Sequence, residues 1–398
     1  MPRYRYLIVG GGMAAYAAVC GIREVDPAGP IGMVSTEHDP PYKRPPLSKS
    51  LWKGRPLDTI WYKLESLGVE PHLSTTVTSI DLPNKILYDN TGTAYAFQKL
   101  LLATGGTPRR LPFGDDRIIY FRTMEDYRRL RTLTEVGDRF CIIGGGFVGS
   151  EIAAALAMNG KDVVMVFPGK TIGSHLFPAG LGKFLNHHYR QKGVELLPGN
   201  TVTGVKRGKR LDVRIRSVHR SGDREVRVDG IVAGIGIEPN TGLARQAGLE
   251  VENGLVVDAH LRTAHPDVYS AGDVAAFYNP FLRKRLRVEH EDNAKEMGRV
   301  AGRAMAGDSQ PYHHLPSFDS RLFEMEYEAV GEADARLETV DDLEDPSVKG
   351  IVYYVRERRV RGVLLWNVRE QVDTARRLIA EPGPFRPEDL KGRLPVPN

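Results

Sequence analysis

One pattern of apolar and polar positions occurs twice along the chain. Residues 6–9 form a short apolar run that precedes a glycine turn and an alanine-rich stretch. Residues 140–143 begin the same succession, after a polar, helix-like segment at 123–135. The apolar run indicates a buried strand, and the alanine-rich stretch indicates a helix. A second apolar run follows in each copy, at 31–35 and 162–167, so each copy predicts the start of a β-α-β unit.

The pattern changes after residue 316. Residues 349–355 and 359–365 are apolar runs rich in β-branched residues, and the short charged turn between them is typical of a hairpin. Residues 367–380 then carry apolar positions at helical spacing. These segments predict a further domain in the C-terminal part of the chain.

The predicted fold class is α/β, with two interleaved, doubly wound (Rossmann-like) dinucleotide-binding domains and a C-terminal α/β domain. We expect the first domain to consist of residues 1–122 and 244–316. Residues 123–243 would form the second domain, and residues 317–398 the third.

Composition narrows the classes of function. Of the 398 residues, 41% are hydrophobic and 26% charged, as in a globular protein of several domains. The net charge of +5 permits acidic or phosphate-bearing partners without requiring nucleic acid. Because Cys20 and Cys141 are the two cysteines, we exclude a disulfide scaffold and a four-thiolate metal site, and expect no metal. No apolar run approaches the roughly 20 residues that cross a bilayer. We therefore expect a cytoplasmic protein with no membrane partner.

The first glycine turn has the spacing of a dinucleotide-binding site. Gly10 permits the tight turn, Gly12 lets a pyrophosphate approach the backbone, and the small Ala15 allows close packing of helix and strand. The helix N-terminus then offers N–H groups to the anion. Glu37 is the expected ligand of the adenosine ribose, with Thr36 as the other candidate position.

The second glycine turn repeats this spacing with Gly144, Gly146 and Gly149. No carboxylate follows its second strand, which weakens the case for NADH over NADPH. Lys170 or His175 could face a 2′-phosphate, and the alternative is that both are solvated loop residues. Two dinucleotide sites in one chain favour hydride transfer between a nicotinamide and a flavin.

Three further stretches, at residues 101–109, 230–240 and 268–273, accompany the two turns in a fixed order. Together they make the chain similar to the two-domain flavoprotein reductases, which include the oxygenase-coupled ferredoxin reductases and the apoptosis-inducing factor group. The resemblance covers about residues 4–380. It implies FAD on the first domain, NADH or NADPH on the second, and a C-terminal interface domain.

Within this family the apoptosis-inducing factor group is the closer match, through residues 42–49 and 146–151 above all. The resemblance implies that Arg44 binds the FAD pyrophosphate, that Lys49 lies beside the flavin ring and that Glu151 pairs with Lys49. Lys49 and Glu151 are thus the expected catalytic residues. A fixed cation stabilises negative charge that develops on a flavin, and a carboxylate keeps that cation charged. The alternative is a surface lysine and an acid that favours the helix N-terminus.

The resemblance implies a wider set of cofactor contacts, in which Glu289 and His290 lie near the pyrimidine edge of the flavin. A structural role for His290 is the alternative. The full set is Gly10, Gly12, Ala14, Ala15, Glu37, Arg44, Lys49, Val77, Ala103, Thr104, Gly105, Gly144, Gly146, Phe147, Val148, Gly149, Glu151, Gly236, Gly272, Asp273, Glu289, His290 and Phe318.

The chain departs from the family at two places. The family has an aromatic pair near the flavin, and this chain retains Phe318 as one member of it. Asp319 stands where the second member, a tryptophan, is expected, and this difference puts the identity of the electron acceptor in doubt. Ser48 and Lys49 stand where peroxidase-type and oxidase-type relatives carry a redox cysteine. A cysteine sulfenic acid mechanism is therefore not expected.

These observations lead to two hypotheses. In the first, NAD(P)H reduces FAD, and the flavin passes electrons to a ferredoxin-like protein, a quinone or another small molecule. In the second, the protein is a redox-sensing module that forms a stable NADH charge-transfer complex and changes its oligomeric state. Basic clusters at 206–210, 283–285 and 356–361 lead to the hypothesis of an acidic electron carrier as partner, whereas the default interpretation is that they are ordinary solvated faces. A homodimer fits the second hypothesis, and nucleic acid is not expected to bind.

Overall fold

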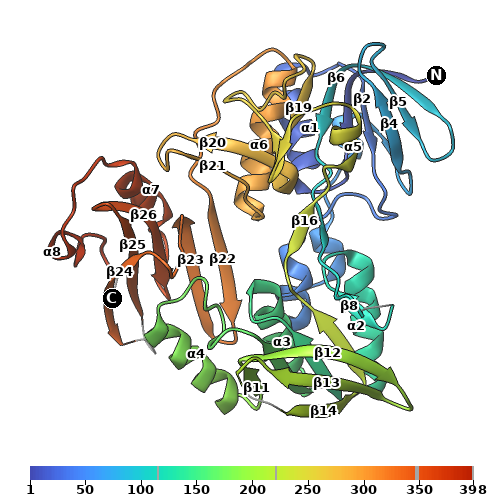
Figure 1. Cartoon of the computed structure of the whole chain (residues 1–398). Helices are drawn as coiled ribbons and strands as arrows, with labels where there is room; N and C mark the ends of the chain where they lie inside the picture. Colours follow the sequence, from blue (N-terminus) through green and yellow to red (C-terminus); the bar gives the residue numbers. More distant parts are fainter. Residues whose placement is uncertain (114–115, 220–221, 346–348, 397–398) are drawn as a thin grey trace. The chain divides into compact units, whose positions relative to one another are not determined.

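The computed structural model describes residues 1–113, 116–219, 222–345 and 349–396. The chain forms two compact units, each built from segments that are distant in sequence (Figure 1). The first unit comprises residues 1–44, 57–107 and 238–316, and the second unit comprises residues 45–56, 108–237 and 317–398.

A seven-stranded sheet forms the centre of the first unit, in the order β3-β2-β1-β6-β5-β4, with β19 also paired to β6. Strands β1, β2, β3, β6 and β19 run parallel, whereas β4, β5 and β6 pair antiparallel. The strands are β1 (Arg3–Val9), β2 (Ile31–Val34), β3 (Val69–His72), β4 (Val77–Asp81), β5 (Ile86–Asp89), β6 (Ala94–Leu102) and β19 (Val268–Ser270).

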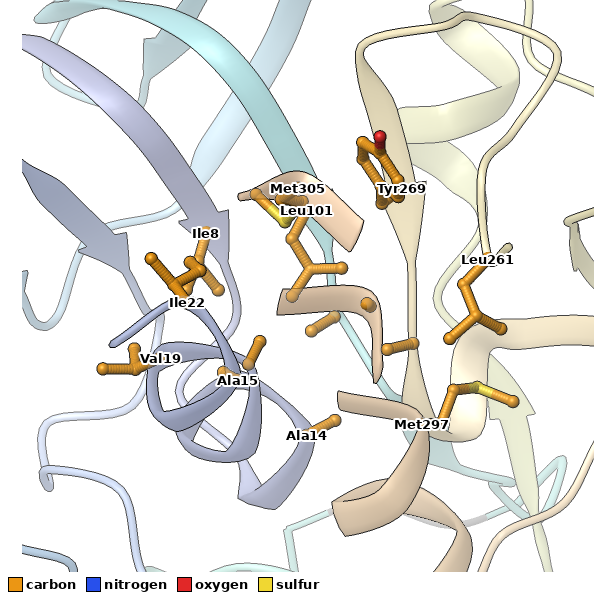
Figure 2. Packing of buried hydrophobic residues seen from close by; sticks show 14 of the residues in the cluster. Ile8, Ala14, Ala15, Val19, Ile22, Leu101, Leu261, Tyr269, Met297 and Met305 are labelled. Atoms are coloured by element: carbon orange, nitrogen blue, oxygen red, sulfur yellow. The ribbon is translucent and has the colours of Figure 1, made fainter. Parts of the chain in front are cut away.

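Helices α1 (Met13–Val25) and α6 (Glu291–Met305) pack closely together in the first unit. A Cβ atom on Gly298 would lie 2.3 Å from the carbonyl oxygen of Ala14, and one on Gly302 would lie 2.1 Å from that of Ala18. Hence the two backbones touch only because these positions lack side chains. Figure 2 shows the apolar cluster around this contact, with side chains from both helices and from the sheet.

The remaining elements of the first unit are short. They are α5 (Gly242–Gln246), β17 (Val251–Glu252), β18 (Gly254–Val256), β20 (Ala275–Asn279), β21 (Lys284–Leu286) and the 3₁₀ turns Leu57–Ile60, Glu65–Leu67 and Gly272–Val274. The chain crosses between the units within β7 (Gly106–Pro108) and β16 (Ile237–Pro239).

A five-stranded parallel sheet with the order β11-β10-β9-β15-β8 lies in the second unit. A three-stranded antiparallel sheet packs against it through a shared apolar cluster that includes Cys141, Val164 and Val213. The elements are β8 (Ile118–Tyr120), α2 (Met124–Val136), β9 (Arg139–Ile143), α3 (Phe147–Met158), β10 (Asp162–Phe167), α4 (Ala179–Gln191), β11 (Glu195–Pro198), β12 (Asn200–Arg207), β13 (Leu211–Ser217), β14 (Asp223–Val228) and β15 (Gly230–Ala233).

The C-terminal part of the second unit is an antiparallel sheet in the order β22-β23-β26-β25-β24, and α7 packs against β23 and β26 (Figure 1). The segment 45–56, with 3₁₀ turns Pro45–Leu47 and Ser50–Lys53, also belongs to this unit. The remaining elements are β22 (Ser317–Leu322), β23 (Met325–Gly331), β24 (Glu338–Asp345), β25 (Lys349–Arg356), β26 (Arg359–Trp366), α7 (Val372–Ala380) and α8 (Pro387–Leu390).

Most expected elements occur where the sequence predicts them, but the helix expected at 367–380 begins only at Val372. Asn367 and Glu370 have φ values of 51° and 61°, which a right-handed helix does not allow. Asn367 instead accepts a hydrogen bond at Oδ1 from the backbone N–H of Glu326. Among the described residues, no helix has the length and apolar character to cross a membrane, and none of the His, Cys, Asp and Glu side chains gather into a metal-binding group.

Candidate functional site

The first glycine turn joins β1 to α1 in the first unit. Gly10 has a φ of 129°, and a Cβ there would lie 2.2 Å from the carbonyl oxygen of Ala103, so this position requires glycine. Gly12 is the N-cap residue of helix α1, which has no side-chain cap and no acidic residue in its first turn. Its first N–H groups therefore remain available to an anion, as a pyrophosphate site needs.

A charged pair lies beside this turn. The Arg44 guanidinium forms an ion pair with Glu37, and both side chains bond to the hydroxyl of Tyr42, at 3.1 and 2.6 Å. Burial by itself would lower the pKa of Arg44. The interactions with Tyr42, Glu37 and Asp273 outweigh burial and raise this pKa, so the side chain is a permanent cation. A Cβ on Gly12 would have an Arg44 nitrogen as its nearest neighbour, at 4.0 Å. The space in front of α1 is thus open and faces a cation, which fits the pyrophosphate of FAD.

Other predicted FAD contacts lie in the same unit. Gly272 has a φ of 79°, and a Cβ there would lie 2.9 Å from that of Ala14. Arg287 donates to the carbonyl of Asp273 at 2.9 Å and pairs with Glu289 at 2.6 Å. Ala15, Ala103, Thr104, Gly105 and His290 lie at the ends of α1, β6 and α6, and Val77 packs against the apolar cluster containing Val9 and Val34.

The second glycine turn joins β9 to α3 in the second unit. A Cβ on Gly144 would lie 2.3 Å from the carbonyl oxygen of Gly234, and one on Gly149 would lie 2.1 Å from that of Gly144. Gly146 is the N-cap residue of helix α3, which has no side-chain cap and no acidic residue in its first turn. No heavy atom of the described chain lies within 4 Å of a Cβ placed on Gly146. The residues present therefore fit a second pyrophosphate.

Aromatic rings border this second turn. The ring of Phe147 lies edge-on to the rings of His175 and Phe318, with centroids 5.5 and 5.0 Å apart. The side chain of Val148 approaches Gly234, and Gly236 accepts a hydrogen bond from the backbone N–H of Arg109. Lys170 and His175 are both exposed, so each can reach a ligand from solvent.

A buried carboxylate lies on α3, two residues beyond the turn. Glu151 is 6% exposed and accepts hydrogen bonds from the hydroxyls of Ser48 and Ser320, each at 2.5 Å. The Lys49 ammonium lies 3.6 Å from Glu151 Oε1, and it donates to the carboxylate and to the backbone carbonyl of Asp319, both at 2.8 Å. We name these five residues the Lys49 cluster.

The Lys49 cluster is assembled by packing of distant segments within the second unit. The indole N–H of Trp52 donates to the Leu47 carbonyl at 2.8 Å, and Asn159 at the end of α3 donates to the Trp52 carbonyl at 3.1 Å. These bonds hold the segment that carries Lys49 against α3. Burial, reinforced by the charge of Glu151, raises the pKa of Tyr189 and of Tyr327 well above the usual range, so both phenols stay neutral.

Sequence reasoning missed Ser320 and gave Ser48 no part in binding. Ser320 lies on β22, far from α3 in sequence. Its place in the core becomes clear only from the face of β22 on which its side chain lies. The alternation along β22, with Ser320 buried between exposed Asp319 and Arg321, was the signal that could have identified it.

Comparisons with known proteins agree with this arrangement. Residues 4–298 match the family described as pyridine nucleotide-disulphide oxidoreductase, and residues 341–381 match the C-terminal family of apoptosis-inducing factor. The chain is 33% identical to apoptosis-inducing factor 1, mitochondrial, of Dictyostelium discoideum, covering 95% of this chain and 79% of that protein. It is 32% identical to the 5,5′-dehydrodivanillate O-demethylase ferredoxin reductase subunit of a Sphingobium species, covering 90% of this chain and 89% of that one.

The fold is shared with solved structures. The crystal structure of a covalent putidaredoxin reductase–putidaredoxin complex contains a similar chain, with a TM-score of 0.90, 26% identity and coverage of 98% of this chain and 95% of that one. The α/β fold class and the family resemblance predicted from the sequence are therefore confirmed.

Proposed function

Since this chain belongs to the pyridine nucleotide-disulphide oxidoreductase family, we propose that it is a reductase in which NADH or NADPH reduces FAD and the electrons pass to a ferredoxin-type carrier. The enzyme class and the two cofactors follow from the family. The observation that carries the proposal is the pair of open, uncapped helix N-termini, one in each unit. FAD, when bound, accepts a hydride from the nicotinamide and releases electrons singly.

In the first unit, the N–H groups of α1 and the Arg44 guanidinium would bind the FAD pyrophosphate. Glu37 keeps Arg44 oriented, because its carboxylate is paired with the guanidinium and held by Tyr42. A cation that is already fixed in place loses little side-chain entropy when the diphosphate arrives.

In the second unit, the N–H groups of α3 would bind the nicotinamide dinucleotide, and Lys49 would provide a fixed positive charge. Ser48 and Ser320 each donate a hydroxyl hydrogen bond to one oxygen of the buried Glu151, so that neither oxygen lacks a partner. An oriented ammonium in a partly desolvated site stabilises negative charge that develops during hydride transfer.

Neither cysteine is suited to relay electrons. Burial raises the pKa of Cys141 to about 12, and burial also raises the pKa of Cys20. A thiol with a raised pKa is a poor nucleophile, because the thiolate is the reactive form. Electrons would therefore leave the flavin directly, without a protein disulfide.

The electron carrier is proposed from the names of the relatives, one of which is a ferredoxin reductase subunit and another a reductase–putidaredoxin complex. A net charge of +5 would steer an acidic carrier towards this chain. The three basic clusters are partly neutralised within the described chain, through the pairs Arg210–Asp229, Arg285–Glu252 and Arg361–Glu332.

An anaerobic titration of the FAD-loaded protein with NADH, and separately with NADPH, tests the proposal. We expect one nucleotide to bleach the flavin band rapidly and an oxidised ferredoxin to restore it. Restoration by a quinone but not by any ferredoxin would move the acceptor to a small molecule. If neither nucleotide bleaches the flavin, the proposal is wrong.

A redox-sensing module is the second candidate, because residues 341–381 match the apoptosis-inducing factor C-terminal family. Such a module would reduce its flavin slowly, retain a long-wavelength charge-transfer band and form a homodimer on reduction. Size-exclusion chromatography with and without NADH separates the candidates, since a carrier reductase has no need to change its size.

A further inference from the structure

Lys49 donates two hydrogen bonds to Asp319. The ammonium donates to the carboxylate and to the backbone carbonyl of this residue, at 2.8 Å each, whereas Glu151 Oε1 lies 3.6 Å away. A distance of 3.6 Å exceeds that of a hydrogen bond between nitrogen and oxygen. At this distance the Glu151 oxygen interacts with Lys49 through its charge, whereas Asp319 orients the ammonium through two hydrogen bonds.

Glu151 is also satisfied without the lysine. Each of its oxygens accepts a hydroxyl hydrogen bond at 2.5 Å, one from Ser48 and one from Ser320. Because a buried carboxylate needs such donors, the two serines can replace the ammonium as its solvation. The orientation of Lys49 can therefore be set by its hydrogen bonds to Asp319.

Strand β22 supplies both contacts from neighbouring positions. Ser320 is 2% exposed and turns to Glu151, whereas the Asp319 side chain is 66% exposed and lies at the rim of the cluster. Successive side chains of a strand point to opposite faces, so the register of β22 separates the two roles. In that register Asp319 pairs with Glu328 of β23.

We propose that Asp319 is the positioning residue for Lys49, holding the ammonium at the rim of the cluster and away from a close pair with Glu151. This inference rests on the proposed function, in which Lys49 stabilises the charge that develops during hydride transfer.

The test compares Asp319→Asn with Asp319→Glu and with the control Asp223→Asn, all in the FAD-loaded protein. Asp223 is an exposed aspartate on β14 whose partner is Arg216, so the control makes the same charge change in the same unit. Exposed ion pairs contribute little to stability, so all three variants should fold. Trace acetylation with acetic anhydride at pH 8, read by peptide mass spectrometry, reports the uncharged fraction of Lys49 without turnover.

We expect Asp319→Asn to raise acetylation of Lys49 about threefold or more, because the ammonium loses its nearest carboxylate. Asp319→Glu should restore most of the protection, and Asp223→Asn should leave it unchanged. Glu151→Gln should raise acetylation less than Asp319→Asn does. Equal acetylation in the wild type and Asp319→Asn, or a larger increase in Glu151→Gln, would overturn the proposal.

The rate of anaerobic flavin reduction provides the second readout. We expect Asp319→Asn to slow this rate severalfold without changing its dependence on nucleotide concentration, and Asp319→Glu to recover it. An unchanged rate in Asp319→Asn would refute the positioning role while leaving the reductase function intact. A wild-type flavin that no nucleotide reduces would refute the reductase function, while acetylation would still test the contact between Lys49 and Asp319.

Discussion

Replacement of Gly146 by alanine tests whether the open space before α3 holds the nicotinamide dinucleotide. The φ and ψ angles of Gly146, −86° and −165°, lie in the extended region that alanine also adopts. A Cβ there meets no heavy atom of the described chain within 4 Å. Alanine at the cap of a helix costs about 0.5 kcal/mol relative to glycine, so the variant should fold and bind FAD normally.

A bound pyrophosphate would occupy the space that the new methyl group enters. Overfilling a well-packed contact by one carbon costs roughly 1–3 kcal/mol. Since each 1.4 kcal/mol is a factor of ten, we expect the dissociation constant of the nicotinamide dinucleotide to rise about 5- to 150-fold. The limiting rate of flavin reduction should change much less, because a pyrophosphate contact is the same before and during hydride transfer and so affects binding rather than the chemical step.

The assay is anaerobic stopped-flow reduction of the flavin across a range of nucleotide concentrations. Gly180→Ala is the matched control, because Gly180 lies on α4 and a Cβ there also meets no atom within 4 Å. Gly12→Ala is the reciprocal variant, and it should lower FAD content instead. A Gly146→Ala protein with an unchanged dissociation constant would refute the assignment of this turn to the dinucleotide.

Three further predictions concern buried or half-buried groups. The double variant Cys20→Ser/Cys141→Ala should retain nucleotide-dependent flavin reduction, and loss of reduction in a protein with full FAD content would point to a thiol relay. Burial, with help from neighbouring carboxylates, raises the pKa of Glu328, so its ionised form destabilises the fold at neutral pH and its protonated form does not. Glu328→Gln should therefore raise the unfolding temperature at pH 7 and less so at pH 4.5; an equal effect at both pH values would contradict this sign. Ser320→Ala removes a bond to a buried charge and should destabilise by about 1.5–3 kcal/mol in urea unfolding of the FAD-loaded protein, with an unaltered midpoint as the contrary result.

The sequence predicts the glycine turns well because the spacing of their glycines is a local signal. The close contact that requires glycine at position 149 is also local, since it involves the Gly144 carbonyl oxygen of the same turn, whereas the contact at Gly10 involves the carbonyl oxygen of the distant Ala103. The family resemblance indicates Arg44, and the spacing of the turn indicates Glu37. In the structure the two side chains form an ion pair. Their roles towards FAD stay a prediction.

The surroundings of Lys49 could be predicted only in part, because they depend on tertiary packing. The pair of Lys49 and Glu151 came from the family resemblance, but the contacts of Ser320 and Asp319 depend on how β22 lies beside α3. Likewise, apolar spacing alone predicts a helix that starts at residue 367. The positive φ of Asn367 excludes that residue from the helix. The structure divides into two compact units, and the division into three domains stays a prediction.

The contact between α1 and α6 has a consequence for synthesis of the chain. The part of α1 that contacts α6 is covered only when α6, which ends at Met305, has been made. A nascent chain that has reached residue 237 contains the second glycine turn and its five parallel strands, yet lacks the helix that completes the first unit. During synthesis the alanine-rich face of α1 that later contacts α6 is therefore uncovered. A chain that stops before residue 291 would leave that face exposed to chaperones and proteases.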